Sequence, residues 1–193
     1  MGALPLIKED PYYTYADYKE WELDEGERFE LMNGEAYAMS APSTIHQIVS
    51  RELFGQFYNY LKDKPCQAFY APYDVRLFYE KDESDDTVLQ PDLVVVCDPE
   101  KLGKEGYHGA PNLVIEILSP SNSVIEMYSK LELYESAGVP EYWVIDPQKK
   151  VVKVFRLNKD RYESILLEAD DTLESTMFPG FVIPLETLFA SAS

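Results

Sequence analysis

Cysteine is scarce in this sequence, and long hydrophobic runs are absent. Only Cys66 and Cys97 occur in 193 residues. They have neither the CxxC spacing nor the density of a disulfide-stabilised fold, so we expect both thiols to be reduced in an intracellular, cytoplasmic protein. No segment approaches the ~18–20 consecutive apolar residues of a membrane-spanning helix, and residues 1–10 lack the basic head and apolar stretch of a secretion signal. We therefore expect neither a membrane protein nor a secreted one.

Basic residues are also few. The chain contains 17 Lys and Arg residues and 35 Asp and Glu residues, which gives a formal net charge of −18. Such a chain repels a phosphate backbone at long range, and this argues against a protein that coats nucleic acid non-specifically. Most of the excess acidic charge lies in residues 1–40 and 80–100. An anionic substrate would therefore have to bind the nearly neutral stretches between and after them.

The length and composition favour one folded unit. A hydrophobic share of 46% is ordinary for a globular protein, and 193 residues correspond to about one domain. We see no internal repeat and no linker-like boundary. We therefore expect residues 1–193 to form a single domain.

An Asn-Gly dipeptide at 33–34 is the clearest local signal. It predicts a two-residue turn that joins strands at 28–32 and 35–39. In that register Glu30 and Glu35 project from the same face of the hairpin, because side chains alternate along a strand.

Hydrophobic spacing and Gly and Pro signals predict the other elements. They are helices over 14–22 and 44–62, a long hairpin of 67–78 and 89–97 around a solvated acidic loop at 80–87, a strand at 113–118, a helix ending at Ala137, a strand at 141–146, a hairpin of 151–157 and 162–167, and an extended tail over 178–189. The strand–helix–strand unit of residues 113–146 requires two parallel strands. The fold class is therefore mixed α+β (α/β), with N- and C-terminal β-hairpins.

Two carboxylates interrupt strands that are otherwise apolar. Asp92 begins the run Leu93–Cys97, and Glu116 lies inside Leu113–Leu118. A buried ionised carboxylate needs a cation, hydrogen bonds or a metal. A salt bridge would satisfy Glu116 alone, whereas a second acid on a neighbouring strand favours a shared Mg²⁺ ion.

Lys130 and His46 are the other candidates. Lys130 shares a helix face with Leu133, Tyr134 and Ala137. It extends its amine to solvent, neutralises Glu116, or stabilises charge that develops on a phosphate near the metal. His46 flanks the apolar face of the helix over 44–62, where it is either a structural residue or part of the site.

The order of these residues resembles the PD-(D/E)XK nuclease superfamily, and specifically its Uma-type branch of restriction endonucleases. The resemblance covers most of the chain and is carried by an ordered set of motifs: Phe29–Glu35, Ser43–Gln47, Ala71–Val75, Gln90–Leu93, Gly109–Pro120, Lys130, Tyr134 and Val139–Trp143. It implies a restriction-endonuclease-like mixed β-sheet core flanked by helices.

The resemblance also implies roles for individual residues. Asp92 and Glu116 correspond to metal ligands, Lys130 to the catalytic lysine and His46 to a histidine of the helix; Glu30 is a candidate outer member. The superfamily usually has lysine two residues after the acid, where this chain has Leu118. The site therefore depends on Lys130 reaching back from its helix, where Glu126 stands at the position that is more often Asp.

These residues predict an endonuclease that depends on Mg²⁺, with Mn²⁺ as a substitute, and that hydrolyses the phosphodiester bonds of nucleic acid, with DNA as the expected substrate. The alternatives are a catalytically silent nuclease-fold binding or interaction module and an enzyme acting on small phosphate esters. Aromatic-rich strands, with 15 tyrosines in the chain, are compatible with a homodimer. A basic strip could bind phosphates or could be an ordinary solvated hairpin: Lys149, Lys150, Lys153, Arg156, Lys159 and Arg161.

Overall fold

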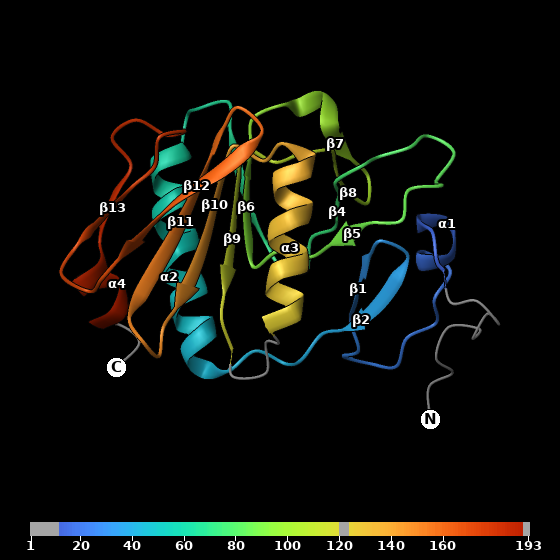
Figure 1. Ribbon diagram of the computed structural model, residues 1–193, viewed down its shortest axis with the longest axis horizontal. Helices are drawn as coiled ribbons and strands as arrows, with labels where there is room; N and C mark the ends of the chain where they lie inside the picture. Colours follow the sequence, from blue (N-terminus) through green and yellow to red (C-terminus); the bar gives the residue numbers. More distant parts are fainter. Residues whose placement is uncertain (1–11, 120–123, 191–193) are drawn as a thin grey trace.

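The computed structural model describes residues 12–119 and 124–190, and Figure 1 shows its arrangement. The protein is a mixed α+β structure built around a central mixed sheet. In spatial order this sheet contains β12 (Arg161–Leu167), β11 (Val151–Asn158), β10 (Glu141–Asp146), β9 (Leu113–Ile117), β6 (Leu93–Val96) and β3 (Gln67–Tyr70). The predicted fold class is confirmed.

A second mixed sheet lies beside the central one. Its order is β2 (Glu35–Ala38), β1 (Phe29–Met32), β5 (Val88–Leu89), β4 (Val75–Arg76), β8 (Gly106–His108) and β7 (Leu102–Gly103). The remaining elements are α1 (Tyr15–Tyr18), α2 (Thr44–Leu61), a short 3₁₀ helix (Pro99–Lys101), α3 (Val124–Ala137), the β13 (Thr172–Glu174) and β14 (Val182–Pro184) pair, and α4 (Leu185–Ala190). In the part of the chain that is described, none of the helices combines the length and the apolar character needed to cross a bilayer.

The central sheet is covered on both faces. Alternate residues of β9 divide between two cores: Leu113 and Ile115 pack against α2, and Val114 packs on the side of α3. Because side chains alternate along a strand, Glu116 belongs to the α3 side. In Figure 1, α2 and α3 lie on opposite sides of the central strands.

The strand–helix–strand unit is confirmed. β9 and β10 are parallel, with Leu113 opposite Glu141, and α3 connects them. The helix ends at Ala137, and Gly138 has a φ of +80°, which is the left-handed conformation that favours glycine. The hairpins at 28–39 and 151–167 also form, and Glu30 pairs with Tyr37 in the predicted register.

The predicted long hairpin of 67–78 and 89–97 is divided between the two sheets. Its pairing is antiparallel as expected, but β3 pairs with β6 in the central sheet and β4 pairs with β5 in the second. Pro72 and Pro91 lie at the two breaks, where a residue without an N–H cannot continue a ladder. Asp92 therefore lies at the junction between the two sheets.

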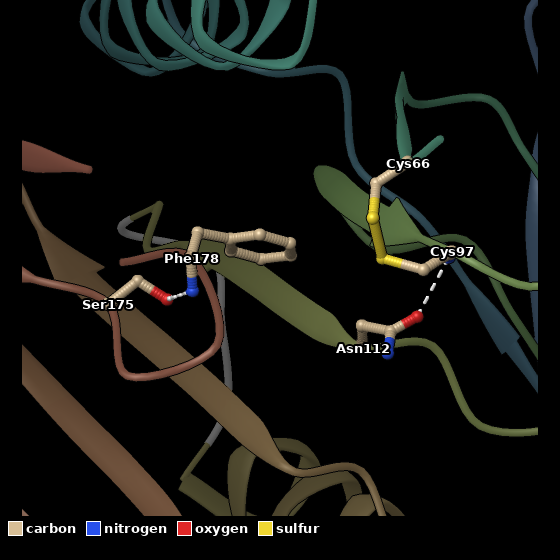
Figure 2. The surroundings of a disulfide bond; sticks show 5 residues. All are labelled: Cys66, Cys97, Asn112, Ser175 and Phe178. Carbon is tan, nitrogen blue, oxygen red and sulfur yellow. Dashed lines mark hydrogen bonds between the residues drawn. A yellow bond between two sulfur atoms is a disulfide. The ribbon is translucent and has the colours of Figure 1, made fainter. Parts of the chain in front are cut away.

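Cys66 and Cys97 form a disulfide with an S–S distance of 2.06 Å, so the prediction of reduced thiols is wrong for this structure (Figure 2). The cause is the strand register. Gln67 pairs with Val96, and one residue further along the antiparallel ladder the two cysteines face each other. A separation of 31 residues in the sequence does not reveal this pairing.

Two further expectations are corrected. The tail over 178–189 is extended only in part, because β14 is followed directly by the helix α4. The buried Glu141 carboxylate holds the segment before this tail by accepting hydrogen bonds from Ser175, Thr176 and Met177. At the other end of the chain, the helix predicted over 14–22 is limited to the four residues of α1.

The acidic loop at 80–87 is not wholly solvated. Asp85 is buried and accepts a 2.8 Å hydrogen bond from Nε of Arg76, which is also buried. The Arg76 guanidinium lies 3.7 Å from the centre of the Tyr15 ring. A guanidinium inside the second sheet requires a counter-charge, and the acidic loop supplies it.

We expect Asp85→Ala to lower the free energy of unfolding by about 3–5 kcal/mol, because Arg76 would be left buried without its partner. Urea denaturation followed by circular dichroism measures the effect. Lys149→Ala is the matched control, since Lys149 and Asp146 form a surface ion pair that should contribute less than about 1 kcal/mol. Equal losses in the two variants would contradict the expectation.

Candidate active site

The two predicted metal-binding carboxylates lie next to each other. In the antiparallel ladder of β6 and β9, Leu93 pairs with Ile115, so the next step brings Asp92 opposite Glu116. Oδ2 of Asp92 accepts a 2.7 Å hydrogen bond from the backbone N–H of Ile117. Both carboxylates line the same cavity. The pleat of two neighbouring strands therefore positions them on one side of the sheet.

Lys130 reaches Glu116 from α3. Its Nζ lies 2.9 Å from Oε1 of Glu116, and the hydroxyl of Tyr134 donates to the same oxygen at 2.9 Å. Lys130 and Tyr134 are four residues apart, so they project from one face of the helix. Both bonds are made to Oε1, which leaves Oε2 of Glu116 free of these two donors.

Glu30 completes the cluster from the second sheet. It is buried, and its two carboxylate oxygens lie 3.0 and 2.9 Å from Nζ of Lys130. The backbone N–H of Gln90 donates to Oε1 of Glu30 at 2.8 Å. Lys130 is therefore held between carboxylates from β1 and β9. Glu30, which the resemblance suggested only as an outer member of the site, contacts Lys130 directly.

Burial and charge change the protonation of this cluster. Burial raises the pKa of the Glu116 carboxyl to about 8; the charge of Lys130 opposes this shift, and the charges of Asp92 and Glu30 add to it. Burial disfavours the Lys130 ammonium, but Glu116 and Glu30 outweigh this effect and raise the pKa of Lys130 well above its ordinary value. Burial, reinforced by the charge of Glu116, also raises the pKa of Tyr134, so its hydroxyl remains a donor.

His46 contacts the other metal-binding candidate. It lies in the first turn of α2, which begins after Ser43, and the Ser43 hydroxyl accepts a hydrogen bond from the backbone N–H of His46. Nε2 of His46 is 3.0 Å from Oδ1 of Asp92. Nδ1 of His46 is buried and has no hydrogen-bond partner among the described residues. The imidazole ring thus holds the Asp92 carboxylate through Nε2, while Nδ1 has no partner among the described residues.

All four predicted site residues line one cavity of about 220 Å³: His46, Asp92, Glu116 and Lys130. Glu126, the acid four residues before Lys130 that the resemblance pointed to, also lines it. Sequence reasoning did not identify Tyr134 as a partner of Glu116, although its four-residue spacing from Lys130 was a usable signal. It also missed Arg28 and Tyr70, which line the same cavity.

The basic segment at 149–161 is not a continuous free strip. Lys149 pairs with Asp146, and Arg161 pairs with Glu135. Arg156 donates to the backbone carbonyl of Glu174. Since β11 is a strand, Lys153 and Arg156 fall on opposite faces of the sheet. The strip therefore gives no single positive surface.

The donor set fits a hard divalent cation. Among the described residues there is no group of three or more His, Cys, Asp or Glu side chains that could hold a metal ion. Asp92 and Glu116 nevertheless offer carboxylate oxygens at one cavity. Mg²⁺ commonly takes one or two carboxylates and fills its other positions with water and phosphate oxygens. The residues present match that pattern and lack the sulfur or multiple histidine ligands that zinc favours.

Fold and site together define a restriction-endonuclease-like protein. Residues 15–186 match the family described as "Uma2: Putative restriction endonuclease", and the chain belongs to this family. It is 26% identical over 166 residues to an uncharacterized protein of Synechocystis sp., with 85% of each chain covered. Its fold is similar to the crystal structure of a "putative nuclease belonging to DUF820" from Anabaena variabilis, with a TM-score of 0.77, 19% identity, and 94% and 99% of the two chains covered. The predicted family is confirmed, and the family assignment supports a nuclease-like function.

The raised pKa of Glu116 predicts a pH-dependent stability. A carboxyl whose pKa is about 8 when folded and 4.5 as its ordinary value contributes stability that is complete below about pH 4.5 and is lost as pH rises towards 8. Relative to Glu116→Gln, the wild-type free energy of unfolding should therefore fall over this window, by at most about 1.4 kcal/mol per pH unit. Urea denaturation across the window measures it.

Glu132→Gln is the control for this titration, because Glu132 is an exposed glutamate of α3. It should leave the pH dependence of stability as it is in the wild type. If Glu116→Gln and the wild type follow parallel curves between about pH 4.5 and about 8, Glu116 does not titrate in this range and the expectation fails.

Proposed function

We propose that the protein is a metal-dependent endonuclease that hydrolyses phosphodiester bonds of DNA, with Mg²⁺ as the metal and Mn²⁺ as a substitute. The observation that carries the proposal is the shared cavity of Asp92 and Glu116, with the amine of Lys130 bonded to Glu116 at 2.9 Å. A carboxylate pair and an ammonium at one concave site are the groups that phosphoryl transfer requires. Membership of a restriction-endonuclease family supports the same reaction class.

Each residue has a distinct task in this proposal. Asp92 and Glu116 would hold the metal ion, which when bound lowers the pKa of a water and polarises the phosphate. Nζ of Lys130 contacts Oε1 of Glu116 and both carboxylate oxygens of Glu30. In this proposal its positive charge orients the attacking water and stabilises charge that develops on the phosphoryl oxygens.

His46 and Glu30 act through these groups. The His46 contact to Oδ1 and the Ile117 N–H contact to Oδ2 hold Asp92 in one orientation. Because Nδ1 of His46 is buried as well as unpartnered among the described residues, the role proposed for His46 is to position Asp92. Glu30 keeps Lys130 charged and directed into the cavity, since it supplies a second buried counter-charge.

One observation favours a second candidate, a nuclease-fold binding module without turnover. Lys130 is engaged by two carboxylates, and in a silent protein this ion-pair cluster would serve only to join the two sheets. The net charge of −18 also weakens attraction to DNA. Turnover by the purified protein distinguishes the two candidates.

We expect the wild type to cleave DNA with Mg²⁺ or Mn²⁺ and to be inactive in EDTA. Asp92→Asn and Lys130→Gln should each lower kcat by about 10²–10³-fold, because each removes a group that acts on charge developing at the phosphate. Cleavage of fluorescent oligonucleotides measures the rates. Circular dichroism spectra establish that the variants fold.

Lys153→Ala is the matched control, because Lys153 is an exposed lysine of β11 away from the cavity. It should retain the wild-type rate. Equal rates in the wild type, Asp92→Asn and Lys130→Gln would reject the assigned site. Binding of DNA without cleavage in either metal would favour the silent module, and turnover of p-nitrophenyl phosphate esters without polymer cleavage would favour a small-ester hydrolase.

A further inference from the structure

An exposed aromatic side chain stands at the cavity. Tyr70 is the last residue of β3; it lines the cavity, yet 57% of its surface is exposed. The Tyr70 ring packs edge-on against Phe54 of α2, with 4.7 Å between ring centres. A large aromatic ring that is supported from behind and open in front is suited to stacking with a planar ligand.

Tyr70 lies close to the carboxylate pair. In the ladder of β3 and β6 it pairs with Leu93, the residue after Asp92, and the N–H of Ala71 donates to the carbonyl of Asp92. The open ring therefore lies across the ladder from Leu93, the chain neighbour of the proposed metal ligand Asp92. A group stacked on Tyr70 would have its covalent neighbours in the same cavity as Asp92.

A cation available to a ligand lines the same cavity. Arg28 immediately precedes β1 and lies two residues before Glu30, so both side chains project from the same face of that chain segment. Arg28 forms no ion pair or side-chain hydrogen bond with any residue in the described ranges 12–119 and 124–190. Lys130, the other basic residue of the cavity, is neutralised by two carboxylates. Arg28 is thus the residue whose guanidinium can donate hydrogen bonds to a ligand phosphate.

Arg28 and Tyr70 reach the cavity from different sheets. Tyr70 belongs to the central sheet, and Arg28 adjoins β1 of the second sheet. The cavity holds about 220 Å³, which is below the ~300–1,000 Å³ of typical small-molecule pockets. A cavity of this size is too small for a base pair, so a base that enters it must be unpaired.

We propose that Tyr70 and Arg28 form a binding subsite for single-stranded DNA, in which a base stacks on Tyr70 and a neighbouring phosphate binds Arg28. This inference rests on the proposed function and specifies its substrate. Stacking on Tyr70 would contribute affinity in addition to the charge contact made by Arg28. The divided basic segment at 149–161 offers no continuous surface to the backbone of a duplex.

Fluorescence anisotropy in EDTA tests the subsite without cleavage. The probes are a labelled single-stranded oligodeoxynucleotide, the duplex of the same sequence and the corresponding RNA. We expect the single-stranded DNA to bind best. Tyr70→Ala should raise its Kd by about 5- to 160-fold, the range expected for losing one base–aromatic stack. Tyr70→Phe keeps the ring and should bind like the wild type.

Arg28 has a separate readout. Arg28→Gln should reduce the slope of log Kd against log salt concentration by about 0.7, the value expected for one phosphate contact on a single strand, and Arg28→Lys should retain the slope. Tyr128→Ala is the control for removing an exposed tyrosine, because Tyr128 is 64% exposed on α3 and does not line the cavity. It should leave Kd unchanged.

The outcomes separate this inference from the proposed function. Preference for the duplex or the RNA, a Tyr70→Ala variant that binds like the wild type, or an unchanged salt slope in Arg28→Gln overturns the subsite even if metal-dependent cleavage is present. Conversely, selective binding of single strands that is lost in Tyr70→Ala supports the subsite even if no metal yields cleavage. In that case the endonuclease proposal is rejected and the binding subsite is retained.

Discussion

The buried ion cluster around Lys130 is the interaction on which the rest of this structure depends. One ammonium contacts Glu30 and Glu116, and Asp92 lies opposite Glu116, so acidic groups outnumber the basic group at this point. A region that is poorly solvated cannot hold this excess negative charge without compensation. Protonation of Glu116 relieves it, which explains its raised pKa, and a divalent cation would relieve it in the same way. The charge imbalance that costs stability is therefore also the source of metal affinity in the proposed function.

The same cluster joins the two sheets. Glu30 comes from β1 of the second sheet, Glu116 from β9 of the central sheet, and Lys130 from the helix between them. Pro72 and Pro91 end the shared hairpin ladder beside Asp92, so the backbone changes sheets where the carboxylates meet. A cavity forms at this junction because neither sheet continues across it. The ion pairs of the cluster therefore require both sheets and α3 to be packed together.

Much of the fold follows from local sequence signals. The Asn-Gly turn, the apolar stripe of α2 and the Gly138 helix end each depend on residues close together in the chain, and each is found as predicted. The failures have a common cause. The disulfide, the burial of Asp85 and the placement of the C-terminal segment each depend on a side-chain partner that hydrophobic spacing does not specify: Cys97 for Cys66, Arg76 for Asp85, and Glu141 for the segment at 175–177. Local patterns carry no information about such partners.

The candidate site divides in the same way. By itself the sequence determined that Asp92 and Glu116 stand in otherwise apolar strands and that Lys130 shares a helix face with apolar residues, because hydrophobic periodicity assigns each side chain to a face. Only the tertiary structure decided that Lys130 would be shared with Glu30, that His46 would hold Asp92, and that Arg28 and Tyr70 would meet at one cavity. The physical reason is that alternation within an element fixes the direction of a side chain, whereas the register between strands and the packing of separate sheets fix what it meets.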